Sequence, residues 1–184
     1  MQFSTFLALF GYAALAAATN SITFKSLDDD SRTVYFVPSI GHEEIEKLKL
    51  DGHAATKVEF PQGWIGNWFS VTEGAEVKPG MLGEVTFNGW NGMTYFDVSA
   101  IVNPGDHAGV KMMYPLESKT PTSGCDNYPC PDKAYYQWDD VQTRVTDETE
   151  LVCTFGNNGV VSIQEDDDDA AAAKVKRDYV LGWF

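Results

Sequence analysis

Hydrophobic and polar residues alternate over many short stretches of this 184-residue chain. Alternation with a period of two is typical of β-strands that are buried on one face. Gly, Pro, Asn and Asp residues separate the stretches and predict turns between them. The expected strands are Ser21–Lys25, Thr33–Val37, Ala55–Phe60, Trp64–Thr72, Met81–Phe87, Thr94–Val102, Val110–Tyr114, Ala134–Trp138, Glu150–Phe155 and Val160–Ile163.

The stretch 40–52 permits two interpretations. Its charged residues and the spacing of Ile45 and Leu48 suit a helix, whereas Leu48 and Leu50 alternate as in a strand. Because flanking glycines leave room for only a short element, we favour a loop followed by a strand. About ten short strands without a long helix predict an all-β fold, either an antiparallel β-sandwich or a barrel.

The first 18 residues have the pattern of a secretory signal peptide. An apolar run, Phe6–Ala17, ends in small residues, so we expect cleavage between Ala18 and Thr19. The run is too short for a membrane span, and no second one follows. The sequence therefore predicts a secreted, extracellular protein whose folded domain comprises residues 19–163.

Residues 164–184 differ sharply in composition from the rest of the chain. An acidic run, Glu165–Asp169, precedes four alanines and a short basic segment, which predicts a disordered tail. Lys176 and Arg177 form a dibasic pair of the kind that secretory proteases cut. Two outcomes stay open, release of Asp178–Phe184 or an uncut tail, and the intact mass of the secreted protein distinguishes them.

Composition excludes several classes of partner and cofactor. The net charge of −14 disfavours nucleic acid, because phosphate binding needs clustered Lys and Arg. His42, His53 and His107 lack the spacing of metal ligands, so we expect neither a metal site nor a cofactor. We expect one disulfide and one free thiol, because the chain has three cysteines. We also expect the protein to be a monomer.

One carboxylate interrupts the most apolar predicted strand. Asp97 lies within Thr94–Val102, and Glu84 lies thirteen residues earlier on the preceding strand. A hairpin of these strands would bring the two carboxyl groups to one surface. Asp97 then either accepts structural hydrogen bonds or faces a cleft, since a buried carboxylate needs partners.

Two segments resemble thaumatin-like proteins. Tyr95–Ser99 (YFDVS) is similar to the family's Tyr-Asp-Val-Ser strand, and Glu84 occupies the position of an acidic residue of that family. Cys130–Asp140 (CPDKAYYQWDD), followed by Thr143 and Cys153, is similar to the family's Cys-Pro segment. The chain resembles the compact fungal secreted branch, which includes elicitor proteins of plant-pathogenic fungi.

The resemblance implies a flattened β-sandwich and a particular disulfide. Larger members carry a disulfide-rich second domain between two cysteine motifs, whereas here both motifs share Cys130. In the family, the first cysteine of the middle pair bonds the late cysteine. The resemblance therefore implies a Cys125–Cys153 disulfide and a free Cys130 thiol.

The resemblance also implies an acidic cleft that binds β-glucans and, in some members, hydrolyses them weakly. Glu84 and Asp97 match two of its positions, and Asp106 is a third candidate. Trp64 and Trp90 offer aromatic faces on which sugars stack, although core packing is the alternative. Val102 stands where another acid belongs, and the strand that should carry an arginine has none.

These observations favour a non-enzymatic secreted protein that binds a wall glycan or a host-surface component and elicits plant defence. The first alternative is a weak endo-β-1,3-glucan hydrolase in which Glu84 and Asp97 are the catalytic carboxyl groups. The second alternative is a secreted structural or antigenic protein without a ligand. The elicitor activity rests on the family resemblance alone.

Overall fold

The structure is a computed structural model that describes residues 19–156. These residues form strands and one 3-10 turn, with no α-helix among them, which confirms the predicted all-β class. The elements are β1 (Asn20–Ser26), β2 (Arg32–Pro38), β3 (Leu48–Leu50), β4 (Ala55–Phe60), β5 (Ile65–Thr72), β6 (Leu82–Thr86), η1 (Trp90–Gly92), β7 (Thr94–Ser99), β8 (Val110–Pro115), β9 (Ser123–Gly124), β10 (Arg144–Thr146) and β11 (Glu150–Phe155).

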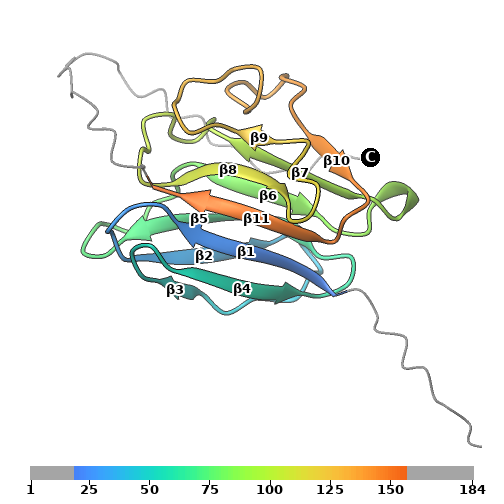
Figure 1. Cartoon of the computed structure of the whole chain (residues 1–184), viewed down its shortest axis with the longest axis horizontal. Helices are drawn as coiled ribbons and strands as arrows, with labels where there is room; N and C mark the ends of the chain where they lie inside the picture. The colour runs from blue at the N-terminus through green and yellow to red at the C-terminus, as the bar shows by residue number, and fades with distance from the viewer. Residues whose placement is uncertain (1–18, 157–184) are drawn as a thin grey trace, which may run out of the picture.

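The strands form two sheets that pack face to face as a sandwich. One sheet has five strands in the order β4-β1-β11-β8-β9, and the other has six in the order β10-β7-β6-β5-β2-β3. Figure 1 shows the first sheet as the front layer and the second behind it. All pairs of strands are antiparallel except β1 and β11, which run parallel.

Within residues 19–156 each predicted strand has a counterpart in the structure except for one segment, although Thr94–Val102 ends earlier, at Ser99, and β9 and β10 were not predicted. The loop-plus-strand interpretation of 40–52 is confirmed, since β3 is the only regular element there. Ala134–Trp138 was predicted as a strand and is a loop, in which Tyr135 makes a single bridge to Ser99. Asp140 accepts hydrogen bonds from two backbone amides of this segment, which bends it away from the sheet.

Several predictions lie outside the described residues. They are the signal peptide with its Ala18–Thr19 cleavage site, the strand Val160–Ile163, the tail and the dibasic pair Lys176-Arg177.

Aromatic side chains fill the space between the two sheets. Phe24 on β1 contacts Trp68 on β5 edge to face, with ring centroids 5.4 Å apart, and Phe155 on β11 at 5.9 Å. Phe60 contacts Trp64 at 5.0 Å in the same core. Such pairs stabilise a fold beyond the effect of area burial alone.

Trp64 therefore does not belong to a ligand-binding cleft, and that prediction was wrong. Its side chain has no exposed surface. Its indole nitrogen donates a hydrogen bond to the Glu43 carbonyl at 2.9 Å, which satisfies the one polar atom of a buried ring. No face of this ring is accessible to a sugar.

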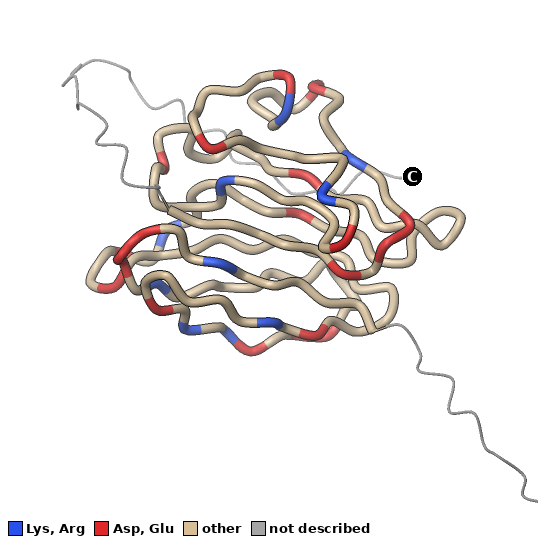
Figure 2. The backbone as a smooth tube through the Cα atoms, viewed as in Figure 1, with Lys and Arg blue, Asp and Glu red and all other residues tan. Residues whose placement is uncertain are grey.

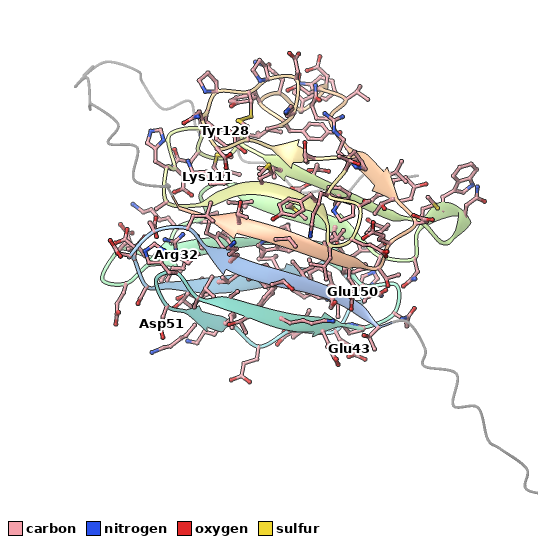
Figure 3. The ribbon with its side chains drawn as sticks, viewed as in Figure 1. Arg32, Glu43, Asp51, Lys111, Tyr128 and Glu150 are labelled. Atoms are coloured by element: carbon pink, nitrogen blue, oxygen red, sulfur yellow. A yellow bond between two sulfur atoms is a disulfide. The ribbon has the colours of Figure 1, made fainter. Side chains whose placement is uncertain are left out.

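Buried charges gather at the end of the sandwich where β8 begins (Figure 3). The Arg32 side chain has no exposed surface, forms an ion pair with Asp28 and donates to the Ala108 carbonyl at 3.0 Å. Lys111 lies over the Tyr128 ring, with its Nζ 5.3 Å from the centroid. These contacts join the β1–β2 turn, the β7–β8 loop and the segment after β9.

The disulfide differs from the one that the family resemblance implies. Cys125 is bonded to Cys130, with Cα atoms 6.4 Å apart, and Cys153 is the free thiol. The Cys153 side chain lies in the core, where the Trp68 indole N–H donates to its sulfur at 3.3 Å. Burial raises the pKa of the Cys153 thiol to about 12, so it stays protonated and unreactive.

Candidate functional site

The outer face of the six-stranded sheet carries a row of polar side chains. Trp68, Val85 and Phe96 point into the core, so the residues beside them on β5, β6 and β7 point outward. Strand pairing places Asn67 opposite Glu84, and Glu84 opposite Asp97. The hairpin expected from the sequence is present, and it brings the two carboxyl groups side by side.

Asp97 is the buried member of this pair. Only 7% of its surface is exposed, whereas Glu84 is half-buried. Its Oδ2 accepts a hydrogen bond from Thr143 Oγ1 at 3.2 Å, and Thr143 Oγ1 lies 2.8 Å from the Tyr135 hydroxyl. Because Thr143 has one hydroxyl proton, Tyr135 donates to Thr143 and Thr143 donates to Asp97.

Glu84 and Asp97 stand directly opposite each other on β6 and β7, and each carboxyl group perturbs the pKa of the other. Two ionised carboxylates are acceptors only, so they repel each other unless one of them holds a proton. Burial raises the pKa of Asp97 well above its usual value, and the negative charge of Glu84 raises it further. Burial also raises the pKa of Glu84, and the interaction with Asp97 offsets that rise only in part, so both groups favour the protonated form, Asp97 more strongly.

Arg144, whose positive charge acts on Asp97, does not form an ion pair with it. Arg144 is paired with Phe96, so its side chain leaves β10 on the side opposite to Asp97. Its guanidinium donates to the carbonyls of Thr122 at 3.1 Å and Asp132 at 2.8 Å. Its positive charge lowers the pKa of Asp97 only in part, since burial and Glu84 outweigh it.

Asp106 has a different environment from the Glu84–Asp97 pair. Its two oxygens accept hydrogen bonds from the backbone amides of Met81 at 2.9 Å and Ala108 at 3.2 Å. A Cβ atom at Gly80 would meet Asp106 Oδ2 at 1.8 Å, so the loop closes on the carboxylate only because glycine stands there. These contacts favour a role for Asp106 in holding the β7–β8 loop.

Trp90 lies at the tip of the β6–β7 hairpin, in the turn η1. It is 74% exposed, and its carbonyl accepts a hydrogen bond from the Tyr95 hydroxyl at 3.3 Å. Tyr95 pairs with Thr86 on one side and with Val145 on the other. An exposed indole thus adjoins the end of the outer face that carries Glu84 and Asp97.

The separation of the carboxyl groups bears on hydrolysis. Glycoside hydrolases hold their two carboxyl groups about 5 to 9.5 Å apart, because a sugar or a water must fit between them. Residues directly opposite each other on antiparallel strands have Cβ atoms about 4.5 to 5.5 Å apart, and Glu84 and Asp97 are such a pair. The two carboxyl groups are therefore close neighbours on one face, an arrangement that lets both contact the same ligand group.

Two further features of the described residues bear on other kinds of site. No three His, Cys, Asp or Glu side chains in residues 19–156 are grouped to hold a metal ion, and no helix there is long and apolar enough to cross a membrane. A shallow pocket of about 280 Å³ is lined by residues 116, 117 and 147–150, none of which was a predicted site residue.

Comparison with known proteins gives one relative at high identity. The chain is 53% identical over 136 residues to the antigenic protein SchS21 of Stachybotrys chartarum, which covers 74% of this chain and 94% of that protein. The chain belongs to the SchS21 family. No family model matches it, so the resemblance to thaumatin-like proteins remains a prediction.

The fold of this SchS21 family member is also found in a solved structure. The crystal structure of the protein elicitor MoHrip2 from Magnaporthe oryzae aligns with a TM-score of 0.55 over 74% of this chain and 98% of that one. Sequence identity in that alignment is 13%, so the likeness concerns the fold alone. The described domain is therefore a β-sandwich of a kind that fungi also use in an elicitor.

Sequence reasoning did not identify Thr143, Tyr135 and Asn67 as members of the outer row. Thr143 joins it because β10 pairs with β7, and Tyr135 because its segment bridges to Ser99. Asn67 lies on the strand where the family resemblance calls for an arginine. Its position beside Trp68 on an alternating strand was the one signal for an outward side chain.

Proposed function

We propose that this SchS21 family member is a secreted, non-enzymatic protein that acts outside the cell as an antigen or elicitor. Two relatives support this proposal, an antigenic protein at 53% identity and an elicitor with the same fold. The signal-peptide pattern of residues 1–18 supports secretion. A disulfide between Cys125 and Cys130 fits an oxidising compartment.

Its ligand is a wall glycan or a host-surface component, and the outer face of the six-stranded sheet receives it. The observation that carries this site is the Glu84–Asp97 pair, which combines a half-buried carboxylate with a buried carboxyl group. Asn67 and Thr143 extend the row with an amide and a hydroxyl. Trp90 supplies an exposed aromatic face next to it.

Weak endo-β-1,3-glucan hydrolysis is the second candidate. The raised pKa of Asp97 favours it, because a glycosidase needs one carboxyl group that stays protonated. The direct cross-strand pairing of Asp97 and Glu84 opposes it, because side chains so placed leave little space between them for a sugar or a water. A secreted antigen without a ligand is the third candidate.

Incubation with laminarin separates the first two functions. We expect no release of reducing ends by the wild-type protein or by Glu84→Gln, because direct cross-strand neighbours leave little space for a sugar or a water between their carboxyl groups. On a glycan array, Glu84→Gln should bind roughly tenfold more weakly, since a hydrogen bond to a charged group contributes about 1.5 to 3 kcal/mol. Glu59→Gln on β4, in the other sheet, is the matched control.

Each result assigns a function. Reducing ends released by the wild type and lost in Glu84→Gln would establish the hydrolase. An array without any hit would leave the protein as an antigen without a glycan ligand.

A further inference from the structure

The carboxyl pair on the outer face has no cationic partner within residues 19–156. The four ion pairs in that part of the chain include neither Glu84 nor Asp97. Asp97 Oδ1 is buried and has no hydrogen-bond partner among the described residues. Buried carboxyl oxygens are normally hydrogen-bonded, so Asp97 Oδ1 lacks a partner that a ligand can supply.

The groups that face the pair cannot supply that positive charge. Asn67 on β5 and Thr143 beside β7 are neutral, and so is the Tyr135 hydroxyl behind Thr143. Arg144 is directed to backbone carbonyls on the other side of its strand. The chain as a whole carries a net charge of −14, so it attracts cations from solution.

Aromatic side chains lie next to Glu84 and Asp97 along the outer face of the sheet. Thr86 and Tyr95 form the next outward-facing pair along β6 and β7, about 7 Å from Glu84 and Asp97. Tyr95 contacts the carbonyl of Trp90, whose indole is exposed. Glu84 and Asp97 lie on adjacent strands of one sheet. Figure 2 shows red Asp and Glu segments spread over the described chain.

We propose that the outer face binds a cationic glycan, a polymer of amino sugars whose amines are free, with an ammonium group at Glu84 and Asp97 and a sugar ring on Trp90. This inference rests on the proposed function, because it names the class of glycan that the same site takes. An ammonium group carries three donors, which match a site made of acceptors. A neutral glucan offers only hydroxyl donors.

Charge also favours the amino sugar. Hydrogen bonds between an ammonium and a carboxylate are about twice as strong as those between neutral groups. Binding of the ammonium replaces the proton on Asp97, and that proton leaves to solvent. A cation held near the Trp90 indole gains further attraction from the face of the ring.

Titration calorimetry with three oligosaccharides tests the inference. A glucosamine oligomer, the N-acetylglucosamine oligomer of equal length and a laminarin oligomer are each added to the full chain at about pH 6, where amines are protonated. We expect the glucosamine oligomer to bind at least about tenfold more tightly than the other two. Glu84→Gln and Trp90→Ala should each weaken its binding by about tenfold.

Glu59→Gln removes the same charge from an exposed position on β4 and should leave binding unchanged. Equal losses in Glu84→Gln and Glu59→Gln would overturn the inference, because the attraction would then be that of net charge alone. Preference for the laminarin oligomer would overturn the cationic class but leave the proposed function intact. Absence of binding to all three oligomers, together with an empty glycan array, would overturn both.

Discussion

Replacing Asp97 by Asn is expected to stabilise the protein at pH 7, although the residue is 7% exposed and hydrogen-bonded. The side-chain amide of Asn donates to the Glu84 carboxylate without a titrating proton, and its oxygen still accepts from Thr143. The substitution thus removes the cost of keeping Asp97 protonated at pH 7, where burial and the charge of Glu84 oppose its ionisation. We expect a gain of roughly 1 to 3 kcal/mol in the free energy of unfolding.

The dependence of wild-type stability on pH follows from the same pair. Because the folded pKa of Asp97 lies well above its unfolded value, its contribution to stability is fully present below about pH 4. That contribution is lost as the pH rises through the raised folded pKa. Urea unfolding across the pH range should therefore show a decline in the wild type that is smaller in Asp97→Asn.

Asp106→Asn is the matched control for this substitution. Asp106 accepts hydrogen bonds from Met81 and Ala108 through separate oxygens, and an amide has only one acceptor. We expect Asp106→Asn to destabilise the protein by about 1 to 3 kcal/mol. Destabilisation by Asp97→Asn at pH 7 would contradict the protonated form of Asp97, because the carboxylate would then be held in its ionised form.

Arg32→Met is expected to lower the free energy of unfolding by roughly 3 to 5 kcal/mol, the usual cost of removing one partner of a buried ion pair. The Arg32 side chain has no exposed surface, and its guanidinium lies 5.9 Å from the centroid of the Phe155 ring. Methionine fills similar space but leaves Asp28 without this cation and Ala108 without its donor. Chemical denaturation monitored by tryptophan fluorescence measures the loss.

Lys57→Met provides the comparison for Arg32→Met. Lys57 pairs with Glu150 at 2.5 Å, but both side chains are about half exposed, 46% and 40%. An exposed pair contributes about 0 to 1 kcal/mol, so this variant should unfold near the wild-type midpoint. Equal effects of the two substitutions would show that the buried contacts of Arg32 with Asp28 and Ala108 do not stabilise the β1–β2 turn and the β7–β8 loop.

The sequence predicted the sandwich well where one face of a strand is buried. Ala55–Phe60 and Glu150–Phe155 match β4 and β11 to the residue, because apolar side chains and turn residues define both ends. Ala134–Trp138 has the same composition as a strand, yet it is a loop. The backbone amide of Tyr136 donates a hydrogen bond to Asp140, which favours a loop over a strand. The alternation of hydrophobic and polar residues does not reveal that contact.

The candidate site was predictable only in part. Glu84 and Asp97 lie on consecutive strands, so a hairpin suffices to bring them together. Thr143 reaches Asp97 across 46 residues of sequence, through a pairing of β10 with β7 that no local signal indicates. Trp64 could serve as a stacking platform by residue type, but it is buried against Phe60, and its indole nitrogen donates to the carbonyl of Glu43, 21 residues earlier.

The cysteines show the limit of a family resemblance. The Cys125–Cys153 pairing assumed that the late cysteine keeps its role when the second domain is absent. In the structure Cys125 meets Cys130 within a short turn, and Cys153 lies in the core beneath Trp68. Three-dimensional neighbours, and not motif order, decide which thiols bond.

Mapping of the bound glycan by ¹H–¹⁵N NMR tests the central claim most directly. A glucosamine oligomer is added to the labelled protein, and the shifts of all backbone amides are followed. We predict that the largest changes fall on the outer face of the six-stranded sheet, around Asn67, Glu84, Asp97 and Trp90. Changes confined to the pocket at residues 116–117 and 147–150, with the outer face unaffected, would contradict the proposed site.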